Sequence, residues 1–321
     1  MSPIVEIEDL HVRFTGERTV HAVNGLSLAL RQGEVLGLLG ESGSGKSVTL
    51  RALLRMLPQH RTRITGSMRV GGEDVLAMDE ARLGDLRGGV VSMIFQEPML
   101  ALDPVYTIGD QIAETVVRHL GLTWSAGRQR ALEMLEGVRI PSARRRLDAY
   151  PHEMSGGMRQ RAMIALALSC DPKVLLADEP TTALDATVQI QILLLLRELQ
   201  RERGMAVIFV THDIGVAVEI SDRIAVMYAG RIVETGTLSD VVKAPAHPYT
   251  RGLLASTVHG AHRGSRLETI AGAPPRLDRL PPGCSFAPRC KVALPDCAKI
   301  DPQDVPLGPE RSARCLLAGA A

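Results

Sequence analysis

Residues 40–47 constrain this chain more than any other segment, because they read GESGSGKS and match the phosphate-loop pattern G-x-x-x-x-G-K-[ST]. In such a loop, glycines let successive backbone N–H groups point at phosphate oxygens. Lys46 can then reach the outer phosphates, and the Ser47 hydroxyl can ligate Mg²⁺. The apolar run 34–39 predicts a buried strand before the loop, and 46–57 predicts a helix after it, which is the context that this motif needs. The expected nucleotide contacts in this loop are Gly40, Ser42, Gly43, Ser44, Gly45, Lys46 and Ser47.

A second motif lies at the end of another apolar run. Residues 174–179 read VLLADE, so Asp178 and Glu179 close a predicted strand. Asp178 can hold Mg²⁺ through water. Successive side chains of a strand point to opposite faces, so Glu179 points away from Asp178 and can act as general base on an attacking water. Strand-end acids can also simply cap a neighbouring helix, but their pairing with a phosphate loop favours the catalytic interpretation.

Short apolar runs alternate with helical patterns along much of the chain. Strands are predicted at 91–95, 173–177, 205–210 and 223–228, with a long helix at 188–203. This alternation indicates an α/β fold with a parallel sheet covered on both faces. The first ~30 residues and Ser67–Val70 alternate more loosely, and they predict a small antiparallel sheet beside the main one.

Residues 97–165 have a different pattern. Apolar residues recur at every fourth position from Ile108 to Leu120, which marks one face of a helix. Helical composition continues after a predicted break at 124–127, which reads WSAG. We therefore expect a helical insertion at about 97–165 within a domain that spans 1–240.

Prolines and cysteines mark the remaining segment, 241–321, which we expect to be a separate extension. The spacing C-x₅-C-x₆-C-x₁₇-C is formed by Cys284, Cys290, Cys297 and Cys315. Four thiols so close in sequence can hold a metal or form two disulfides, and a reducing compartment disfavours the disulfides. Thiolates suit zinc or an iron–sulfur cluster, and this spacing lacks the C-x₂₋₄-C hairpin of most zinc sites. The fifth cysteine, Cys170, is predicted to be a small buried hydrophobe.

Composition argues against some classes of function. The chain has 37 basic and 36 acidic residues, so it has no excess of positive charge for a broad nucleic-acid-binding face. No run approaches the ~20 apolar residues of a membrane span. The N-terminus lacks the basic and apolar segments of an export signal, so we expect the chain to remain in the cytoplasm.

The segment SGGMRQR, which begins at Ser155, opens a predicted helix and offers a second anion site of one hydroxyl and two glycine amides. Together with the phosphate loop and the acidic strand end, it resembles the signature of ATP-binding cassette (ABC) ATPases. The resemblance implies a RecA-like core with an antiparallel β subdomain and a helical subdomain. It also implies that Ser155, Gly156 and Gly157 face the γ-phosphate of an ATP held by an opposite subunit. The chain departs from the family in the flanking residues, because Met154 and Met158 stand where leucine and glutamine are usual.

The same resemblance assigns roles to four further residues. Phe14 would stack on adenine, although a core aromatic is the alternative. Gln96 matches a glutamine that contacts Mg²⁺ and the γ-phosphate, and Asp185 belongs to an Ala-Leu-Asp loop that crosses the dimer interface. His212 matches a switch histidine that contacts the γ-phosphate and orients the water. The implied Mg²⁺ ligands are Ser47, Gln96 and Asp178, and the implied catalytic residues are Glu179, His212 and Gln96.

Finer features resemble one branch of this family, the ATP-binding subunits of oligopeptide/dipeptide importers. The matching segments are 95–99, 102–109, 150–161 and the His-Pro-Tyr of 247–249, which the cysteines follow. In that branch the cysteine segment resembles a 4Fe–4S site, so the resemblance implies such a cluster on the four cysteines of the extension, with zinc as the alternative. Its role would be to hold together an extension that has few apolar residues of its own.

The implied activity is ATP hydrolysis that drives import of di- or oligopeptides or related small solutes. The implied partners are two integral-membrane permease subunits, a second ABC ATPase (a sister chain or a copy of this one) and an extracytoplasmic solute-binding protein, with no nucleic acid. The location would be the cytoplasmic face of the inner membrane. An alternative is an ABC ATPase that acts on nucleic acid or the ribosome, but ribosomal versions usually carry two cassettes in one chain. A regulatory ATP-binding module without turnover is a third reading, which Glu179 and His212 argue against.

Overall fold

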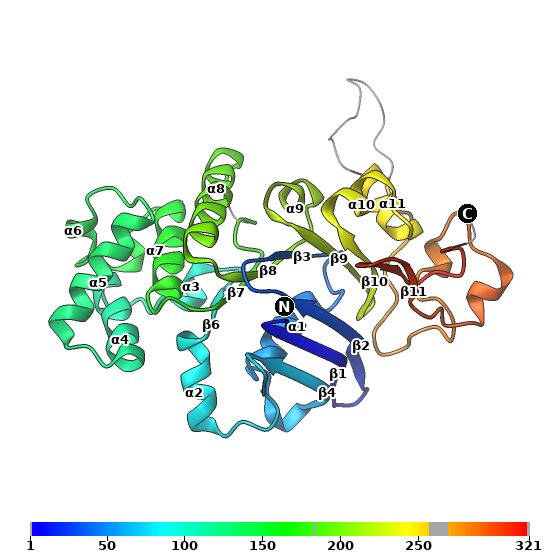
Figure 1. The fold of residues 1–321 in the computed structure, drawn as a ribbon, viewed down its shortest axis with the longest axis horizontal. Coiled ribbons are helices and arrows are strands. Elements are labelled where there is room, and N and C mark those ends of the chain that lie inside the picture. The colour runs from blue at the N-terminus through cyan, green and yellow to red at the C-terminus, as the bar shows by residue number, and fades with distance from the viewer. Residues whose placement is uncertain (1, 183, 257–268, 320–321) are drawn as a thin grey trace. The chain divides into compact units, whose positions relative to one another are not determined.

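The computed structural model describes residues 2–182, 184–256 and 269–319, which form two compact units (Figure 1). The first unit contains Met1–Leu30, Glu34–Leu76 and Phe209–Ala321, and the second contains Arg31–Gly33 and Ala77–Ile208. Strand β8 (Ala206–Thr211) begins in the second unit and ends in the first. The phosphate loop and the cysteine segment therefore belong to one unit, although they are distant in sequence.

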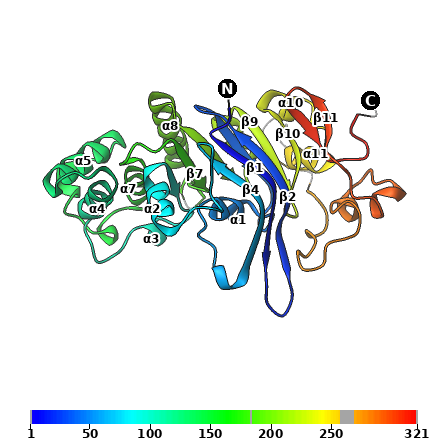
Figure 2. The same cartoon turned by 60° about the horizontal axis from the view of Figure 1, so that its bottom comes forward.

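A four-stranded antiparallel sheet forms part of the first unit (Figure 2). Its strands, in the order β2-β1-β4-β5, are β2 (Val20–Leu30), β1 (Val5–Phe14), β4 (Thr62–Val70) and β5 (Glu73–Asp74). The side chains of Val5, Ile7, Leu10 and Val12 are buried, and a register shift between Ile7 and Leu10 keeps both halves of β1 facing the core. The small antiparallel sheet predicted from the loose alternation is confirmed.

The other strands of the first unit follow the order β11-β12-β10-β9-β3. Their bounds are β3 (Val35–Leu39), β9 (Arg223–Tyr228), β10 (Arg231–Thr237), β11 (Val305–Gly308) and β12 (Arg311–Ala313). Strands β3 and β9 pair in parallel, and every residue of β3 is buried, which explains its unbroken apolar run. The C-terminal extension adds β12 to the edge of β10 through the pairs Glu234–Ala313 and Thr235–Ser312.

Short helices complete the first unit. They are α1 (Lys46–Leu53), α9 (Ile214–Ile220), α10 (Leu238–Lys243) and α11 (Pro248–Ala255), with 3₁₀ turns at Gln59–Arg61, Ala287–Arg289 and Pro295–Ala298. The helix predicted at 46–57 is shorter than expected. It ends at Leu53, and Arg55 two residues later takes a left-handed φ of 48°, which an α-helix cannot contain.

The second unit pairs two parallel strands and surrounds them with helices (Figure 1). The strands are β6 (Val91–Ile94) and β7 (Val174–Asp178). The helices are α2 (Glu80–Gly89), α3 (Pro98–Ala101), α4 (Ile108–Leu120), α5 (Trp124–Gly137), α6 (Ala143–Arg146), α7 (Gly156–Leu168) and α8 (Ala186–Arg203), with a 3₁₀ turn at Pro151–Glu153. The predicted strands and the long helix lie within two residues of these bounds.

Helix α4 confirms the four-residue periodicity, but the break predicted at 124–127 is wrong. Those four residues are the first turn of α5. Thr123 caps this helix, since its hydroxyl accepts a hydrogen bond from the backbone N–H of Ala126 at 3.3 Å. Gly127 lies against α4, where a Cβ would be 3.0 Å from the carbonyl oxygen of Ala113, so close packing of the two helices accounts for a glycine in this first turn. Across the part of the chain that the structure describes, no helix is both long enough and apolar enough to span a membrane.

Candidate functional site

The phosphate loop runs from the end of β3 to the start of α1. Gly45 is the N-cap of α1 with a left-handed φ of 105°, and a Cβ there would lie 2.4 Å from the carbonyl oxygen of Ala22. A Cβ at Gly40 would lie 2.2 Å from the carbonyl oxygen of Met227. Only glycine fits at these two positions, so the backbone itself lines the loop, as in loops that bind anions through backbone N–H groups. The predicted order of strand, loop and helix is confirmed.

Two polar side chains of the phosphate loop, Lys46 and Ser44, are buried. The Lys46 ammonium is buried and donates to the carbonyl oxygens of Gly40 at 2.7 Å and Glu41 at 2.9 Å. The Ser44 hydroxyl is buried, and the described residues provide it with no hydrogen-bond partner. A buried cation and an unpaired buried hydroxyl suit a bound polyanion, which could satisfy both groups. The loop therefore fits the triphosphate of ATP. Of the other predicted contacts, Ser42 and Gly43 lie in the turn and Ser47 is the second residue of α1.

Two other predicted residues of the first unit lie at strand ends. Phe14 is the last residue of β1, where it pairs with Val20 and Thr62, and its side chain is partly exposed. His212 follows β8 directly and is exposed, and the next residue, Asp213, caps α9. Stacking of Phe14 on adenine and contact of His212 with the γ-phosphate remain predictions.

The second unit brings Gln96 and Glu179 together. Asp178 ends β7 and is 1% exposed, while Glu179 after it takes a left-handed φ of 46°. The Glu179 carboxylate accepts a hydrogen bond from the Thr182 hydroxyl at 3.0 Å and a long one from the Gln96 amide at 3.5 Å. A non-glycine residue in this region of φ and ψ is strained, which is typical of residues that are positioned for function. The general-base and Mg²⁺ roles of these residues remain predictions.

The serine–glycine segment caps helix α7. The Ser155 hydroxyl accepts from the backbone N–H of Met158 at 3.4 Å, and both Ser155 and Gly156 are exposed. A Cβ on Gly156 would meet no atom within 4 Å, whereas one on Gly157 would lie 3.0 Å from a methyl group of Val188. Packing within this chain thus explains the glycine at 157 but not the one at 156. Asp185 caps α8 through the N–H of Val188, and Ala183 of the same predicted loop lies outside the described residues.

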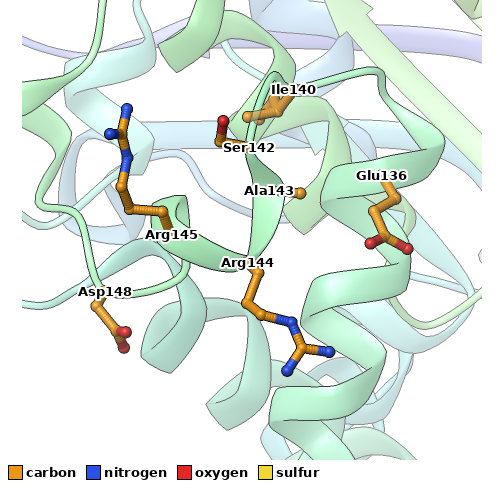
Figure 3. A pocket seen from close by; sticks show the side chains of 7 residues that line it. All are labelled: Glu136, Ile140, Ser142, Ala143, Arg144, Arg145 and Asp148. Carbon is orange, nitrogen blue, oxygen red and sulfur yellow. The ribbon is translucent and has the colours of Figure 1, made fainter.

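A shallow pocket of about 850 Å³ lies in the second unit beside α6 (Figure 3). Its lining residues are Glu136, Ile140, Ser142, Ala143, Arg144, Arg145 and Asp148. The two arginine side chains point in opposite directions, and an acidic side chain lies on the side of each, Asp148 near Arg145 and Glu136 near Arg144 (Figure 3). The pocket contains none of the predicted nucleotide residues and does not form a concentrated anion site.

The four cysteines of the extension are free thiols, of which Cys297 and Cys315 are buried. Burial raises the pKa of the Cys284 and Cys290 thiols, and the neighbouring Cys297 and Cys315 shift them in the same direction. The Sγ of Cys315 accepts from the backbone N–H of Leu317 at 3.4 Å. The thiols are thus near neighbours, but among the described residues no three His, Cys, Asp or Glu side chains are arranged to hold a metal ion. In this arrangement the expected 4Fe–4S or zinc site is not formed.

Cys170 lies apart from these four in the second unit. It is buried, its Sγ lies 3.7 Å from the carbonyl oxygen of Thr115, and burial raises its pKa. This environment suits the small buried hydrophobe that the sequence predicted.

Sequence reasoning missed two residues that contact the loop or its neighbours. Arg289 of the extension forms an ion pair with Glu41, the second residue of the loop, and its side chain is 5% exposed. Tyr249 accepts a hydrogen bond from the backbone N–H of Glu41 at 2.8 Å. Glu41 occupies a position that the phosphate-loop pattern leaves open, and no sequence spacing links it to Arg289.

Comparison with known proteins agrees with this geometry. Residues 23–182 match the family model described as "ABC transporter", and residues 233–297 match "Oligopeptide/dipeptide transporter, C-terminal region". A relative from Brucella abortus (strain 2308), which bears the name of a peptide import ATP-binding protein, is 49% identical over 98% of this chain and 95% of its own length. A second relative from the same strain, with the same kind of name, is 47% identical over 98% of this chain and 97% of its own length.

Solved structures lead to the same family. One is a dimeric ATP-binding cassette in a post-hydrolysis state with ADP and Pi; it has a TM-score of 0.65 and 29% identity, over 73% of this chain and 98% of its own. Another, CbiO1 of Clostridium perfringens, is part of an ABC transporter complex and has a TM-score of 0.65 and 27% identity, over 76% and 92% of the two chains. The predicted ABC cassette fold is confirmed. Because relatives nearly half identical align along almost its whole length, the chain belongs to the ABC transporter family of ATP-binding proteins, in the branch with the oligopeptide/dipeptide transporter C-terminal region.

Proposed function

We propose that this chain is the ATP-hydrolysing subunit of an importer for di- or oligopeptides or related small solutes. The observation that carries the proposal is the glycine-lined loop at the head of α1 in a chain whose two parts match the cassette and the oligopeptide/dipeptide transporter extension. The names of the Brucella relatives, which are peptide import ATP-binding proteins, support the substrate class. Bound ATP and Mg²⁺ would supply the γ-phosphate and the charge that the chemistry needs.

In this proposal, the phosphate loop binds the nucleotide phosphates and Glu179 accepts a proton from water. The loop amides and the Ser44 hydroxyl would donate to phosphate oxygens, and Lys46 would exchange its two carbonyl partners for phosphate. Thr182 donates to the Glu179 carboxylate and orients it, and this carboxylate would accept a proton from the attacking water. Gln96 lies against the same carboxylate, so it would sense whether the site is filled.

The exposed tip of α7 would complete the site of a second ATPase subunit. Among the residues that the structure describes, no atom lies within 4 Å of a Cβ placed at Gly156, and this supports a role of its bare backbone toward a ligand or partner from outside. A solved cassette with 29% identity is a dimer that holds ADP and Pi, which supports an ATPase pair. The second subunit would be a sister chain or a copy of this one.

The remaining partners follow from the importer role. Two integral-membrane permease subunits would form the path for the solute, and an extracytoplasmic solute-binding protein would deliver it. This chain would then lie at the cytoplasmic face of the inner membrane and drive the permeases by closing and reopening against its partner ATPase.

The cysteines of the extension would bind a 4Fe–4S cluster, with zinc as the alternative. Four near-neighbour thiols and the backbone N–H donated to Cys315 Sγ support this, because such hydrogen bonds are common around cluster sulfurs. The thiols would have to move to reach a common centre, since the described arrangement holds no metal group. Protein purified without oxygen should contain iron and acid-labile sulfide near four each per chain. Colourless protein with one zinc per chain would show that the metal is zinc. Protein that contains neither iron nor zinc would contradict a metal site on these cysteines.

The transport role is tested by purification of the tagged full chain from its own cells in mild detergent. We expect integral-membrane permeases to co-purify, and the ATPase rate of the complex in vesicles to rise when peptide-loaded binding protein is added inside the lumen. A chain that instead co-purifies with ribosomes, or with nucleic acid that high salt removes, contradicts the importer role.

A further inference from the structure

The C-terminal extension holds the phosphate loop at Glu41, on both the side chain and the backbone. The Glu41 carboxylate accepts two hydrogen bonds from the Arg289 guanidinium, at 2.7 and 2.9 Å, across 248 positions of sequence. The backbone N–H of Glu41 donates to the Tyr249 hydroxyl at 2.8 Å. Its backbone carbonyl accepts from Lys46 at 2.9 Å, so one residue links the extension to the phosphate-binding lysine.

Arg289 is fixed from several sides, which makes it a rigid support. Its guanidinium donates to the Ala271 carbonyl at 3.0 Å and to the Tyr228 hydroxyl at 3.2 Å, besides the two bonds to Glu41. It lies 5.8 Å from the ring centre of Tyr228 and 6.0 Å from that of Phe286. In this two-pronged pair the arginine is almost fully buried and Glu41 is partly exposed, and the pair defines a geometry as well as a charge.

The surrounding aromatic side chains form a platform under this ion pair. Tyr228, Tyr249 and Phe286 pack against one another with ring centres 4.6 to 5.4 Å apart. Tyr228 ends β9, Tyr249 is in α11 and Phe286 precedes the 3₁₀ turn that carries Arg289. The platform therefore joins the sheet that carries the loop to the extension.

We propose that Arg289 is a positioning residue for nucleotide binding, which acts from the C-terminal extension by fixing Glu41 and cancelling its charge inside the phosphate loop. Without the guanidinium, an uncompensated carboxylate would lie in a loop that must accept a polyanion, and the Glu41 backbone would lose its fixed position. The proposal rests on the proposed ATPase function, because it assigns the loop to nucleotide phosphates. It predicts that nucleotide affinity depends on the extension and not on the cassette alone.

The test measures binding of MgATP to the full-length chain with a fluorescent ATP analogue. In Arg289→Gln we expect the dissociation constant to rise roughly tenfold, because the uncompensated Glu41 carboxylate then repels the polyanion. The apparent KM should rise by the same factor while kcat changes by less than about threefold, because the substitution acts on binding. Hydrogen exchange of the loop in the nucleotide-free protein should become faster.

Two variants separate this role from mere folding. Arg276→Gln is the matched control, because Arg276 forms the same two-pronged pair with Asp278 in the extension, at 3.0 and 2.8 Å, but is exposed. It should leave affinity and loop exchange unchanged. Glu41→Gln combined with Arg289→Gln should bind MgATP no more weakly than Arg289→Gln alone, because the double variant lacks the lone carboxylate.

The outcomes are distinct. The inference is overturned if folded Arg289→Gln binds MgATP like the wild type, or if the two substitutions weaken binding additively. If Arg289→Gln does not fold, Arg289→Lys is measured instead. It keeps the charge but loses the fork, so faster loop exchange than in the wild type supports the positioning role and wild-type exchange overturns it. A wild-type chain that fails to bind MgATP contradicts the proposed function itself.

Discussion

At the scale of single residues, Glu179 at the end of β7 has a strained backbone conformation. Glu179 takes a left-handed φ of 46° immediately after the buried Asp178. Such a conformation costs about 1–3 kcal/mol and persists only where neighbours enforce it. The Thr182 hydroxyl donates a hydrogen bond to the Glu179 carboxylate, so the position of this carboxylate is fixed by its side chain as well as by its backbone.

Replacement of this carboxylate by an amide tests its role as a base. Glu179→Gln should keep MgATP binding and lower the ATPase rate at least about 100-fold, because an amide cannot accept the proton from water. Steady-state phosphate release and nucleotide binding of the same preparation check this. The matched control is Glu198→Gln, since Glu198 is an exposed partner of Arg139 on α8 and should be neutral. Turnover near the wild-type rate would remove Glu179 as the base.

At the scale of elements, helix α11 depends on a buried histidine. His247 caps the helix, because its Nδ1 accepts the backbone N–H of Tyr249 at 3.0 Å. Burial lowers the pKa of His247 to about 4 from 6.5. A protonated Nδ1 cannot accept this hydrogen bond, so the cap requires the neutral ring.

The pH dependence of stability follows from this shift. The unfolded chain binds a proton at His247 near pH 6.5, but the folded chain does so only near pH 4. The free energy of unfolding should therefore fall as the pH is lowered through this interval, by about 2 kcal/mol between pH 7.5 and 5. His247→Asn retains a capping oxygen without a titrating group, so its denaturation midpoint should lose that part of the pH dependence. The free energy of unfolding is measured by urea denaturation at pH 7.5 and at pH 5. If it changes by the same amount between these pH values in His247→Asn and in the wild type, the prediction is wrong.

The N-terminus of α7 poses a different question, because Gly156 has space for a methyl group. Gly156→Ala should leave the melting temperature within about 2 °C, since it removes no contact and adds no clash. It should nevertheless slow ATP turnover several-fold if a partner's phosphate approaches this backbone. Gly137→Ala at the end of α5 is the matched control, because a Cβ there also meets nothing within 4 Å. Equal rates for both variants would contradict the interface role.

At the scale of the whole molecule, the cassette and its extension act as parts of a larger assembly. The chain holds the phosphate loop and the serine–glycine tip, but that tip is proposed to serve another subunit. ATPase activity per chain should therefore rise with protein concentration, or on addition of the sister subunit. Turnover measured over a hundredfold range of dilution checks this, and a constant specific activity would contradict the shared site.

Much of this protein was predictable because its key features are local in sequence. The octet at 40–47, with the apolar run before it, defined the strand, loop and helix, and its glycines proved necessary at 40 and 45. Periodicity located α4 to the residue, because Ile108, Ile112 and Val116 are buried on one face, but Leu120, the last apolar residue of the repeat, is 44% exposed. The end of α1 and the start of α5 were mispredicted, because a left-handed Arg55 and a capping Thr123 outweigh average composition.

Sequence alone determined that the chain is an α/β protein with a phosphate loop, an acidic strand end and a serine–glycine helix tip, because each motif is contiguous and carries its own chemistry. Only the tertiary structure decided that Arg289 pairs with Glu41 and that, among the described residues, packing accounts for the glycine at 157 but not for the one at 156. These depend on contacts between distant segments, and such contacts are set by packing of the whole chain rather than by spacing along it.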